Sequence, residues 1–569
     1  MVKKLFQQGS QIFTQRQKTI LSAALIIMLM IAASRVLGLM RNRVLAHFFS
    51  VEDLSVYFAA FRIPETIFEV LVFGTFSSAF IPIFTSYISQ KKKDEAWNIA
   101  SISLNFAFLI FLVLAIFIFI FAGPLYRLIA PGFSPEQALQ IANLARVLLL
   151  AQAFFVLSYF LTSVLESMQR FLVPALAPIL YNLGIVLGTI FLSSSMGLYA
   201  PVIGAVIGAF FHFLIQLPLA FFLGFRPKFK IDLKNPGVRE IGRLALPRIV
   251  ELSSLQIGKM AELFLASLVS TAAYTYYTFA NSLALLPIGL FGISMAKASL
   301  PTLSYQAAQD QKKDFVETLT SLFKQVVFFI LPCAVFLAVL RIPIVRLVFG
   351  ADRFTWQSTL QTGWTLSAFC LGILAQGLIY PLTRGFWALH DTKTPVKISL
   401  GTIVLNISLG AIFILWLKLS IWTLALAFSL ASSLQVILLF FFLSRKVKEL
   451  NLKKIFFSFT RIAFSAFGSG LLMFFLLKVL DRSAWDKNLS FLRWVGLKLP
   501  TSFQSFVLDT RYTFNLILLT AFVAVIGILF YFLLAWLLKV EELSLLKKLI
   551  AKFKKPRILP EVITPTSAE

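Results

Sequence analysis

The chain has 569 residues, of which 59% are hydrophobic and only 14% are charged. A soluble domain carries about a quarter charged residues, so this composition excludes a chain of soluble domains. The 62 phenylalanines and a mean hydropathy of +0.87 indicate long apolar segments that cross a membrane. The formal net charge is +27, but most of the basic residues lie between apolar runs. This distribution favours topology signals beside anionic lipid, and no nucleic-acid partner is expected.

Windows of about 20 apolar residues predict an all-α integral membrane protein with about 14 transmembrane helices. Their centres lie near residues 30, 73, 109, 153, 184, 212, 256, 288, 329, 371, 407, 433, 469 and 526. An even number places both termini on one side. With the N-terminus inside, about thirty Lys and Arg residues face the cytoplasm and about eleven face outward, so we expect both termini in the cytoplasm. A signal peptide ending at Ala32-Ala33-Ser34 is the weaker alternative, because its cleavage would set the loops against this bias.

Two halves of the chain repeat each other at an offset of about 219 residues. Ala79-Phe80-Ile81-Pro82 matches Ala298-Ser299-Leu300-Pro301, and Leu125-Tyr126-Arg127 matches Ile344-Val345-Arg346. The offset maps the first six spans onto the next six, so both copies enter the membrane in the same orientation. Two parallel six-helix repeats of this kind favour a transporter with two lobes and alternating access. The last two spans are then an addition at the C-terminus.

The expected organisation follows from these spans. The boundaries are 1–19 for a cytoplasmic N-terminus, 20–225 for the N-lobe, 226–243 for a cytoplasmic linker, 244–445 for the C-lobe, 446–538 for spans 13 and 14 with a long outer loop at 481–512, and 539–569 for a basic tail. Within the tail, residues 541–555 predict a basic amphipathic helix on the inner leaflet, where anionic lipids are the expected partner. The last residues, from Pro560, are expected to be disordered.

Charged residues inside apolar spans are costly, so each one indicates a partner or a function. Span seven carries four of them within roughly 80° of one another on a helix: Arg248, Glu251, Lys259 and Glu262. They predict a polar stripe that lines a cavity. Because the stripe is net neutral, an internal ladder of ion pairs is an equally open interpretation.

The first two spans carry a different set of charges. Arg35 and Arg41 of span one have no acidic residue near them in sequence. Arginine presents a planar fork that binds phosphate oxygens at two points and keeps its charge when buried, so span one predicts a phosphate site. The two arginines are about 120° apart on a straight helix, and facing one cavity would require a bend, for which Gly38 is the candidate. Snorkelling of Arg41 and Arg43 to the membrane interface is the alternative. Span two adds Arg62, which shares a helix face with Glu65 and Glu69.

Enzyme motifs are scarce in this sequence. The three histidines lie far apart, and neither a Walker A motif nor a metal-ligand spacing occurs, so no cofactor, metal site or ATP-driven pump is expected. His390-Asp391 on an inner loop is the best catalytic pair, and it is weak. Cys333 and Cys370 lie inside apolar segments, which gives no disulfide framework. We therefore expect a transporter and not an enzyme. Nothing in the spans requires a dimer, so the protein could act as a monomer.

Five motifs are spread over both halves of the chain: Ser34-Arg35-Val36-Leu37-Gly38-Leu39-Met40-Arg41, Phe61-Arg62-Ile63-Pro64, Gly74-Thr75-Phe76-Ser77-Ser78-Ala79-Phe80-Ile81-Pro82, Leu286-Pro287-Ile288-Gly289-Leu290-Phe291-Gly292-Ile293 and Ala388-Leu389-His390-Asp391-Thr392-Lys393-Thr394-Pro395-Val396-Lys397. Together they resemble the MurJ (MviN) lipid II flippase family of the MOP exporter superfamily. The resemblance extends over roughly residues 20 to 540.

This resemblance implies a fourteen-helix flippase of the bacterial cytoplasmic membrane. Such a protein moves lipid II, the undecaprenyl-diphosphate-linked peptidoglycan precursor, from the inner to the outer leaflet for cell-wall synthesis. Its two lobes would enclose a cationic cavity, and its last two helices would form a groove for the lipid tail. Two arginines of the first helix are thought to contact the diphosphate in this family, and they fall on Arg35 and Arg41. Arg62 is the third candidate ligand.

The chain also departs from the family pattern. Several cavity charges are missing or reversed: Ser55 stands where an Asp is frequent, Phe68 or Glu69 where an Arg is frequent, and Asn281 or Ser282 where another Arg is frequent. Either Arg62, Arg248 and Lys259 compensate, or the headgroup of the cargo differs. The alternatives are therefore a flippase or exporter of another polyprenyl-linked oligosaccharide, an ion-coupled small-molecule exporter, and a membrane scaffold without transport.

Overall fold

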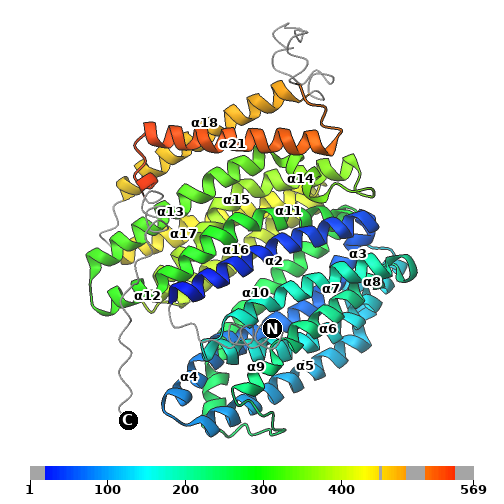
Figure 1. Cartoon of the computed structure of the whole chain (residues 1–569), viewed down its shortest axis with the longest axis vertical. Helices are drawn as coiled ribbons and strands as arrows, with labels where there is room; N and C mark the ends of the chain where they lie inside the picture. Colours follow the sequence, from blue (N-terminus) through cyan, green and yellow to red (C-terminus); the bar gives the residue numbers. More distant parts are fainter. Residues whose placement is uncertain (1–19, 448–451, 482–506, 545–569) are drawn as a thin grey trace, which may run out of the picture. The chain divides into compact units, whose positions relative to one another are not determined.

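The structure is a computed structural model that describes residues 20–447, 452–481 and 507–544 (Figure 1). Its first helices are α2 (Ile20–Phe48), α3 (Val51–Phe68), the π-helix η1 (Glu69–Phe80), α4 (Ile81–Ser89), α5 (Lys93–Ile129), α6 (Pro135–Ser167), α7 (Leu172–Met196), α8 (Tyr199–Leu214) and α9 (Leu217–Phe222). The next are α10 (Pro236–Val269), α11 (Ala273–Pro287), the π-helix η2 (Ile288–Ile293), α12 (Ser294–Ala308), α13 (Lys312–Val339), α14 (Arg341–Phe349), α15 (Trp356–Ala388), α16 (Lys393–Ala411), the π-helix η3 (Ile412–Trp416) and α17 (Trp422–Lys446). The last two are α18 (Leu452–Leu480) and α21 (Thr513–Leu537).

The expected all-helical membrane protein is confirmed. Every predicted span centre falls inside one of these helices, and 12 spans between Lys93 and Leu537 are long and apolar enough to cross a membrane. The two other expected spans fall on α2 and on the run α3, η1 and α4, which carry the charges singled out from the sequence. In α3, for example, four of 18 residues are charged: Glu52, Asp53, Arg62 and Glu65.

The internal duplication reappears in the irregular points of the backbone. Three pairs of residues with left-handed φ are each about 220 residues apart: Lys91 and Asp310, Gln169 and His390, Gly197 and Lys418. A hydroxyl caps both copies of one helix, Ser134 for α6 and Thr355 for α15. The π-helices η1 and η2 likewise continue α3 and α11. These shared irregularities support the repeat of spans one to six as spans seven to twelve.

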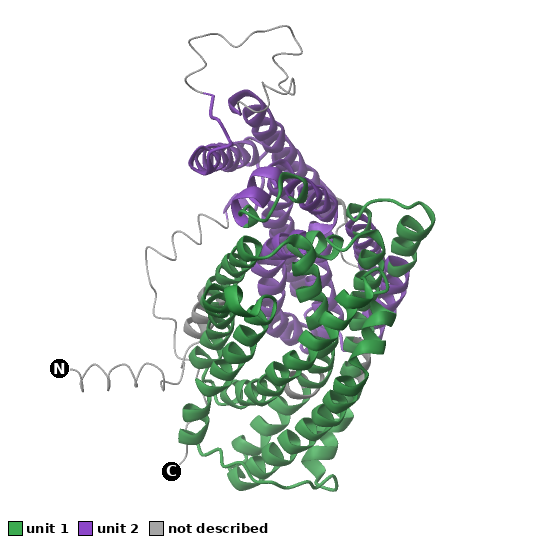
Figure 2. Ribbon diagram, turned by 90° about the vertical axis from the view of Figure 1, so that its right-hand side faces the viewer, with its two compact units in different colours: residues 1–279, 349–358, 407–424 green, residues 280–348, 359–406, 425–569 purple. Residues whose placement is uncertain are grey.

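The helices pack into two compact units (Figure 2). Within the described ranges, unit 1 contains residues 1–279, 349–358 and 407–424, and unit 2 contains residues 280–348, 359–406 and 425–569. Unit 1 therefore holds α10 together with α2 to α9. The predicted lobes are defined by the repeat rather than by packing, and their boundaries stay a prediction.

Glycines bring α7 and α8 of unit 1 into backbone contact. A Cβ at Gly184 would lie only 2.5 Å from Gly208 Cα, and one at Gly188 would lie 2.6 Å from Gly204 Cα. Small residues allow this approach. Helix association in a membrane depends on such close van der Waals contact, because the hydrophobic effect does not act between helices in lipid. The tight pair fixes α7, which also packs on α2 and carries Asn182 toward it.

A proline shapes α3, which carries Arg62. Pro64 has no N–H, so the carbonyl of Ala60 loses its helical hydrogen bond. Tyr126 of α5 replaces that donor, because its buried hydroxyl donates to the Ala60 carbonyl at 2.7 Å. The helix therefore continues through the proline to the start of η1, with its interior carbonyl satisfied.

In unit 2, α13, α18 and α21 form a helical cluster in which α18 and α21 lie side by side (Figure 1). The Tyr531 hydroxyl of α21 donates to the Phe328 carbonyl at 2.8 Å. The buried Lys324 of α13 contacts two residues that follow α21. It donates to Glu541 at 2.8 Å and lies 3.7 Å from Glu542. Most of the predicted amphipathic helix, the end of the tail, and residues 482–506 of the outer loop lie outside the described residues.

His390-Asp391, the weak catalytic candidate, forms a helix cap. His390 adopts a left-handed φ of 57°, and Asp391 accepts hydrogen bonds from the backbone and hydroxyl of Thr394 at 3.0 and 2.7 Å. Lys446 at the end of α17 also donates to Asp391. Burial opposes ionisation of this carboxyl, but the hydrogen bonds from Lys446 and Thr394 outweigh it and lower the pKa of Asp391 to about 2. The pair therefore joins the start of α16 to the end of α17.

We expect Asp391→Asn to lower the thermal midpoint of the detergent-purified protein at pH 7, because it removes an ion pair and weakens the cap. A folded-state pKa below the ordinary value means that the carboxylate stabilises the fold above about pH 4. That contribution is lost as the pH falls toward about 2. The difference between wild type and variant should therefore shrink on acidification, in melts recorded from pH 7 to pH 3.

Asp310→Asn is the matched control. Asp310 also lies in a left-handed turn, but its ion pair with Lys312, at 3.5 Å, is exposed on both sides. Exposed pairs contribute little, so this variant should melt like the wild type. A pH-independent difference for Asp391→Asn would contradict the assignment of its charge to the stabilisation.

Candidate functional site

Six charged side chains from four elements of unit 1 form one electrostatic cluster. Glu65 interacts with Arg62, Glu69, Lys259 and Arg41, and Arg62 interacts in turn with Glu262. The elements are α2, α3, η1 and α10. We call this set the charge cluster; it consists of Arg41, Arg62, Lys259, Glu65, Glu69 and Glu262. Three basic side chains face three acidic ones, so the formal net charge of the cluster is zero.

Arg41 is held by neutral acceptors rather than by a carboxylate. Its Nη1 donates to Asn182 Oδ1 at 3.1 Å, and its Nε and Nη2 donate to Asn42 Oδ1 at 3.2 and 3.0 Å. Asn42 is buried and Asn182 is nearly so. The amide oxygens orient the guanidinium without neutralising its charge, and a guanidinium has more N–H groups than these bonds use. Arg41 is therefore a partly buried, oriented cation that can still bind an anion.

Arg35 lies on the same helix as Arg41 but in a different environment. Its side chain is exposed, and α2 runs as one helix from Ile20 to Phe48. Gly38 therefore lies inside a continuous helix. The structure brings Arg41 into the charge cluster and leaves Arg35 at the surface of unit 1.

Arg62 is paired with a tyrosine of α11. Its Nε and Nη2 donate to the Tyr274 hydroxyl at 3.1 and 2.6 Å. Tyr274 is only 2% exposed, so its ring and hydroxyl hold the guanidinium in place. Like Arg41, Arg62 is oriented by a neutral acceptor. The carboxylates of Glu65 and Glu262 lie close enough to interact with it electrostatically.

Lys259 of α10 pairs with Glu69, the first residue of η1. Their Nζ and Oε2 atoms are 2.8 Å apart, and the two side chains are 38% and 28% exposed. Gln256, one turn earlier on α10, also donates to Glu69. The ion pair of Lys259 thus runs between helices that are distant in sequence, while Lys259 also interacts electrostatically with Glu262 along α10.

The rest of the predicted stripe on α10 divides between two surroundings. Glu262 accepts a hydrogen bond from Tyr277 of α11 and belongs to the charge cluster. Arg248 lies about four turns before Glu262 on the same helix and is partly buried. The side chain of Glu251 lies outside the described part of the structure. Lys259 and Glu262 are the members of the stripe that the structure brings to Arg41 and Arg62.

Neutral polar residues complete the cluster, and sequence reasoning missed them. They are Asn42, Asn182, Gln256, Tyr274 and Tyr277. The available signals were weak: an asparagine within an apolar helix, and the tyrosine-rich start of α11. Within the described ranges, no group of His, Cys, Asp or Glu residues could hold a metal ion.

Two positions where a charge was expected from the resemblance serve packing instead. The buried Ser55 hydroxyl lies 2.8 Å from the Thr275 hydroxyl and accepts the Thr275 backbone N–H at 3.0 Å. Phe68 is buried between the rings of Phe155 and Tyr159, at centroid distances of 5.5 and 5.1 Å. In place of a charge, Ser55 makes hydrogen bonds to Thr275 of another helix, and Phe68 packs against two aromatic rings.

Comparison with known proteins places these residues in a family. The family described as lipid II flippase MurJ matches residues 44–496. The chain is 30% identical over 411 residues to a probable lipid II flippase MurJ of Vibrio cholerae, covering 70% of this chain and 78% of the relative. It is 25% identical over 382 residues to the lipid II flippase MurJ of Burkholderia cenocepacia, covering 66% and 74%.

Solved structures show the same fold. The inward closed conformation of the lipid II flippase MurJ superimposes with a TM-score of 0.72 at 25% identity, covering 92% of this chain and 100% of that one. An inward-facing multidrug resistance MATE family transporter of the MOP superfamily gives a TM-score of 0.61 at 15% identity, covering 73% and 95%. At that identity, the second likeness concerns the fold alone.

We expect Tyr274→Phe to lower the thermal midpoint of the detergent-purified protein. The change removes the only side-chain acceptor that the structure gives Arg62 in the described ranges, and an unpaired buried polar group costs about 1–3 kcal/mol. Tyr305→Phe is the control, because Tyr305 is 63% exposed. Equal midpoints for the two variants would show that Tyr274 does not orient Arg62.

Proposed function

The chain belongs to the lipid II flippase MurJ family, and we propose that Arg41 and Arg62, with Arg35, bind the diphosphate of lipid II while it crosses the membrane. The family is one of transporters, so the protein is a multi-pass membrane transporter and not an enzyme. Its cargo is lipid II, the polyprenyl-diphosphate-linked precursor for which the family is named. Alternating access carries this lipid from the inner to the outer leaflet.

The observation that carries the assignment of residues is the way in which Arg41 is held. Two amide oxygens fix its guanidinium at 3.0–3.2 Å and leave its charge unneutralised. Arg62 is fixed in the same manner by a phenol. A diphosphate offers several anionic oxygens to such forks, and two-point contacts between guanidinium and phosphate are strong and directional. Arg35, which is exposed on α2, supplies a further cation for the initial encounter.

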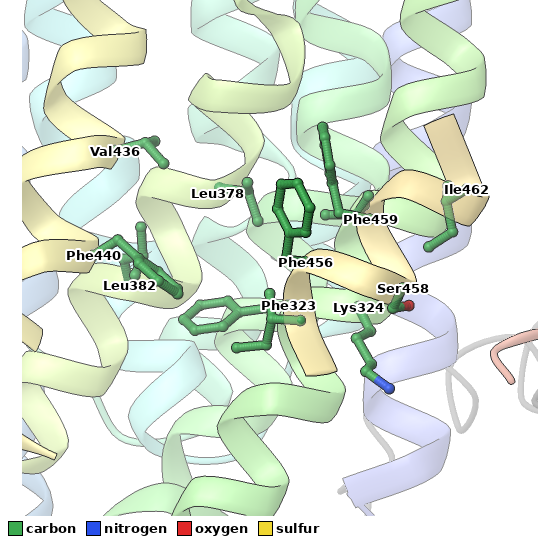
Figure 3. Close-up of a pocket in the computed structure, with 12 residues that line it drawn as sticks. Phe323, Lys324, Leu378, Leu382, Val436, Phe440, Phe456, Ser458, Phe459 and Ile462 are labelled. Atoms are coloured by element: carbon green, nitrogen blue, oxygen red, sulfur yellow. The ribbon is translucent and has the colours of Figure 1, made fainter. Parts of the chain in front are cut away.

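The lipid tail has a separate candidate site in unit 2 (Figure 3). A cavity of about 300 Å³ lies between α13, α15, α17 and α18, and its lining is apolar apart from Lys324 and Ser458. Phe456 and Phe459 of α18 point toward Leu378 of α15 and border it. An apolar cavity of this kind suits part of a polyprenyl chain, which has no polar atoms to satisfy. The resemblance likewise implies a groove at the last two helices.

Topology and partners complete the proposal. The bias of basic residues supports termini in the cytoplasm of a bacterium and insertion in its cytoplasmic membrane. Anionic lipids are the proposed partners of the basic tail, whose residues from 545 lie outside the described ranges. The transporter is proposed to work as a monomer, without a cofactor.

A flippase for another polyprenyl-linked oligosaccharide is the second candidate. The observation that favours it is the replacement of family charges at Ser55 and Phe68, which the structure uses for packing. Both candidates need a diphosphate site, so they differ in the sugar part of the cargo alone. Exporters of small cations fit less well, because the hydrogen bonds of Arg41 to the described residues go to amide oxygens.

Binding of lipid II to the detergent-purified full chain tests the site. Arg41→Ala removes one charge-assisted contact of about 1.5–3 kcal/mol, so affinity should fall by about 10- to 150-fold while the protein stays folded. Arg41→Lys should retain part of the affinity, because a point charge replaces the fork. Arg127→Ala, which removes an exposed arginine at the end of α5, should bind like the wild type.

Undecaprenyl diphosphate without the sugar and peptide separates the two candidate cargoes. Preference for complete lipid II supports the lipid II flippase. Equal affinity for the bare diphosphate lipid moves the function to another polyprenyl-linked cargo, and equal binding by Arg41→Ala and wild type would refute the role of Arg41.

The tail site is tested by filling the cavity. Val436→Trp should weaken binding of lipid II with its long tail and leave a short-chain analogue unaffected, because the indole occupies space that the tail would use. Val113→Trp is the control, at a position on α5 that is 60% exposed. Equal losses for long and short tails would show that this cavity does not receive the tail.

A further inference from the structure

Glu69 occupies a position where the backbone changes its winding. It directly follows the last residue of the regular helix α3, and it is the first residue of the 12-residue π-helix η1. π-Helical segments are rare and occur frequently at functional sites. The carboxylate is 28% exposed and its partner Lys259 is 38% exposed, so water and solutes can reach both.

Gln256 supplies an independent sign that this site has a second state. The residue is only 2% exposed, and its Nε2 donates to Glu69, while its Oε1 is buried and has no hydrogen-bond partner among the described residues. A buried amide oxygen without a donor is costly. A half-turn of the amide exchanges Nε2 and Oε1. The oxygen would then face Glu69, and it would be satisfied by a Glu69 carboxyl that carries a proton.

The surrounding charges determine when such a proton is favourable. Glu65 on α3, Lys259 on α10 and the Tyr159 hydroxyl on α6 interact with Glu69 directly. Arg62 on α3, Arg41 on α2 and Glu262 on α10 belong to the same charge cluster and act on it through Glu65 and Arg62. α4 contains no charged residue, and the charged residues of α5 lie at its two ends. Lys259 is the one cation in the described ranges with a direct ion pair to Glu69. Once another anion takes Lys259, the Glu69 carboxylate loses its ion-pair partner and is left beside Glu65.

We propose that Glu69 is a proton-binding site which exchanges Lys259 for a proton when the diphosphate of the cargo binds. This inference rests on the proposed function. Without cargo, the Glu69 carboxylate holds the Lys259 ammonium. When the diphosphate binds, its oxygens form an ion pair with the Lys259 ammonium, and a proton from the solvent adds to Glu69. The amide of Gln256 then turns, so that its Oε1 accepts a hydrogen bond from the protonated Glu69 carboxyl. The diphosphate brings two negative charges, one on each esterified phosphate, and the proton on Glu69 offsets one of them.

Calorimetry of lipid II binding to the detergent-purified full chain tests the exchange. Titrations at pH 7 in buffers of different ionisation enthalpy give the number of protons taken up per bound lipid. The diphosphate of lipid II is esterified at both ends and has no proton to exchange near neutral pH. We expect the wild type to take up about one proton, as for a single carboxyl group. Glu69→Gln should bind lipid II with an uptake near zero.

Glu240→Gln is the matched control, because it removes an exposed carboxylate from the same helix α10, and it should behave like the wild type. Wild-type binding without proton uptake would overturn the exchange, and so would equal uptake by Glu69→Gln. The wild-type result decides the matter even where the variant does not fold. Failure of the wild type to bind lipid II at all would instead refute the proposed function and, with it, the inference.

Discussion

The cost of charge in a membrane determines how the candidate site of this protein is built. An ionised side chain in an apolar span must be paired or oriented by polar groups, since the hydrocarbon offers neither. The charge cluster satisfies this constraint in two ways. Arg41 and Arg62 are held by neutral oxygens of Asn42, Asn182 and Tyr274, whereas Lys259 is held by a carboxylate. The first kind of partner preserves a net positive charge at the residue, and the second kind cancels it.

The repeat makes this arrangement asymmetric. Both copies share their helix order, their left-handed turns and a π-helix within the second span. Yet the run from Thr278 to Ala296 in the second copy has no charged residue, whereas the corresponding run of the first copy contains Arg62, Glu65 and Glu69. Duplication therefore preserved the backbone and not the chemistry. Among these second spans, charged chemistry resides in the copy that belongs to unit 1.

Much of the fold was predictable because apolar length and periodicity are local properties of the sequence. The spans, the repeat and the unusual charges of α2, α3 and α10 all follow from them. The pairings do not, since Lys259 and Glu69 are 190 residues apart and no local pattern relates them. Arg41 shows the same limit, because its partner Asn182 was indistinguishable from any other polar residue in an apolar helix. His390-Asp391 failed for the opposite reason: capping uses the same residue types as catalysis.

A neutral cluster suits a transporter better than a permanently cationic one. A flippase must bind its anionic headgroup on one side and release it on the other, so an affinity that is too high would trap the cargo. Glu65, Glu69 and Glu262 compete with the diphosphate for the three cations, which lowers the net gain of binding. Because Arg41 and Arg62 have neutral hydrogen-bond partners, they can keep those partners when the anion arrives. Lys259 cannot, so its ion pair is the contact that must open. The conformational consequence of binding is therefore expected to start where η1 meets α10, at Glu69.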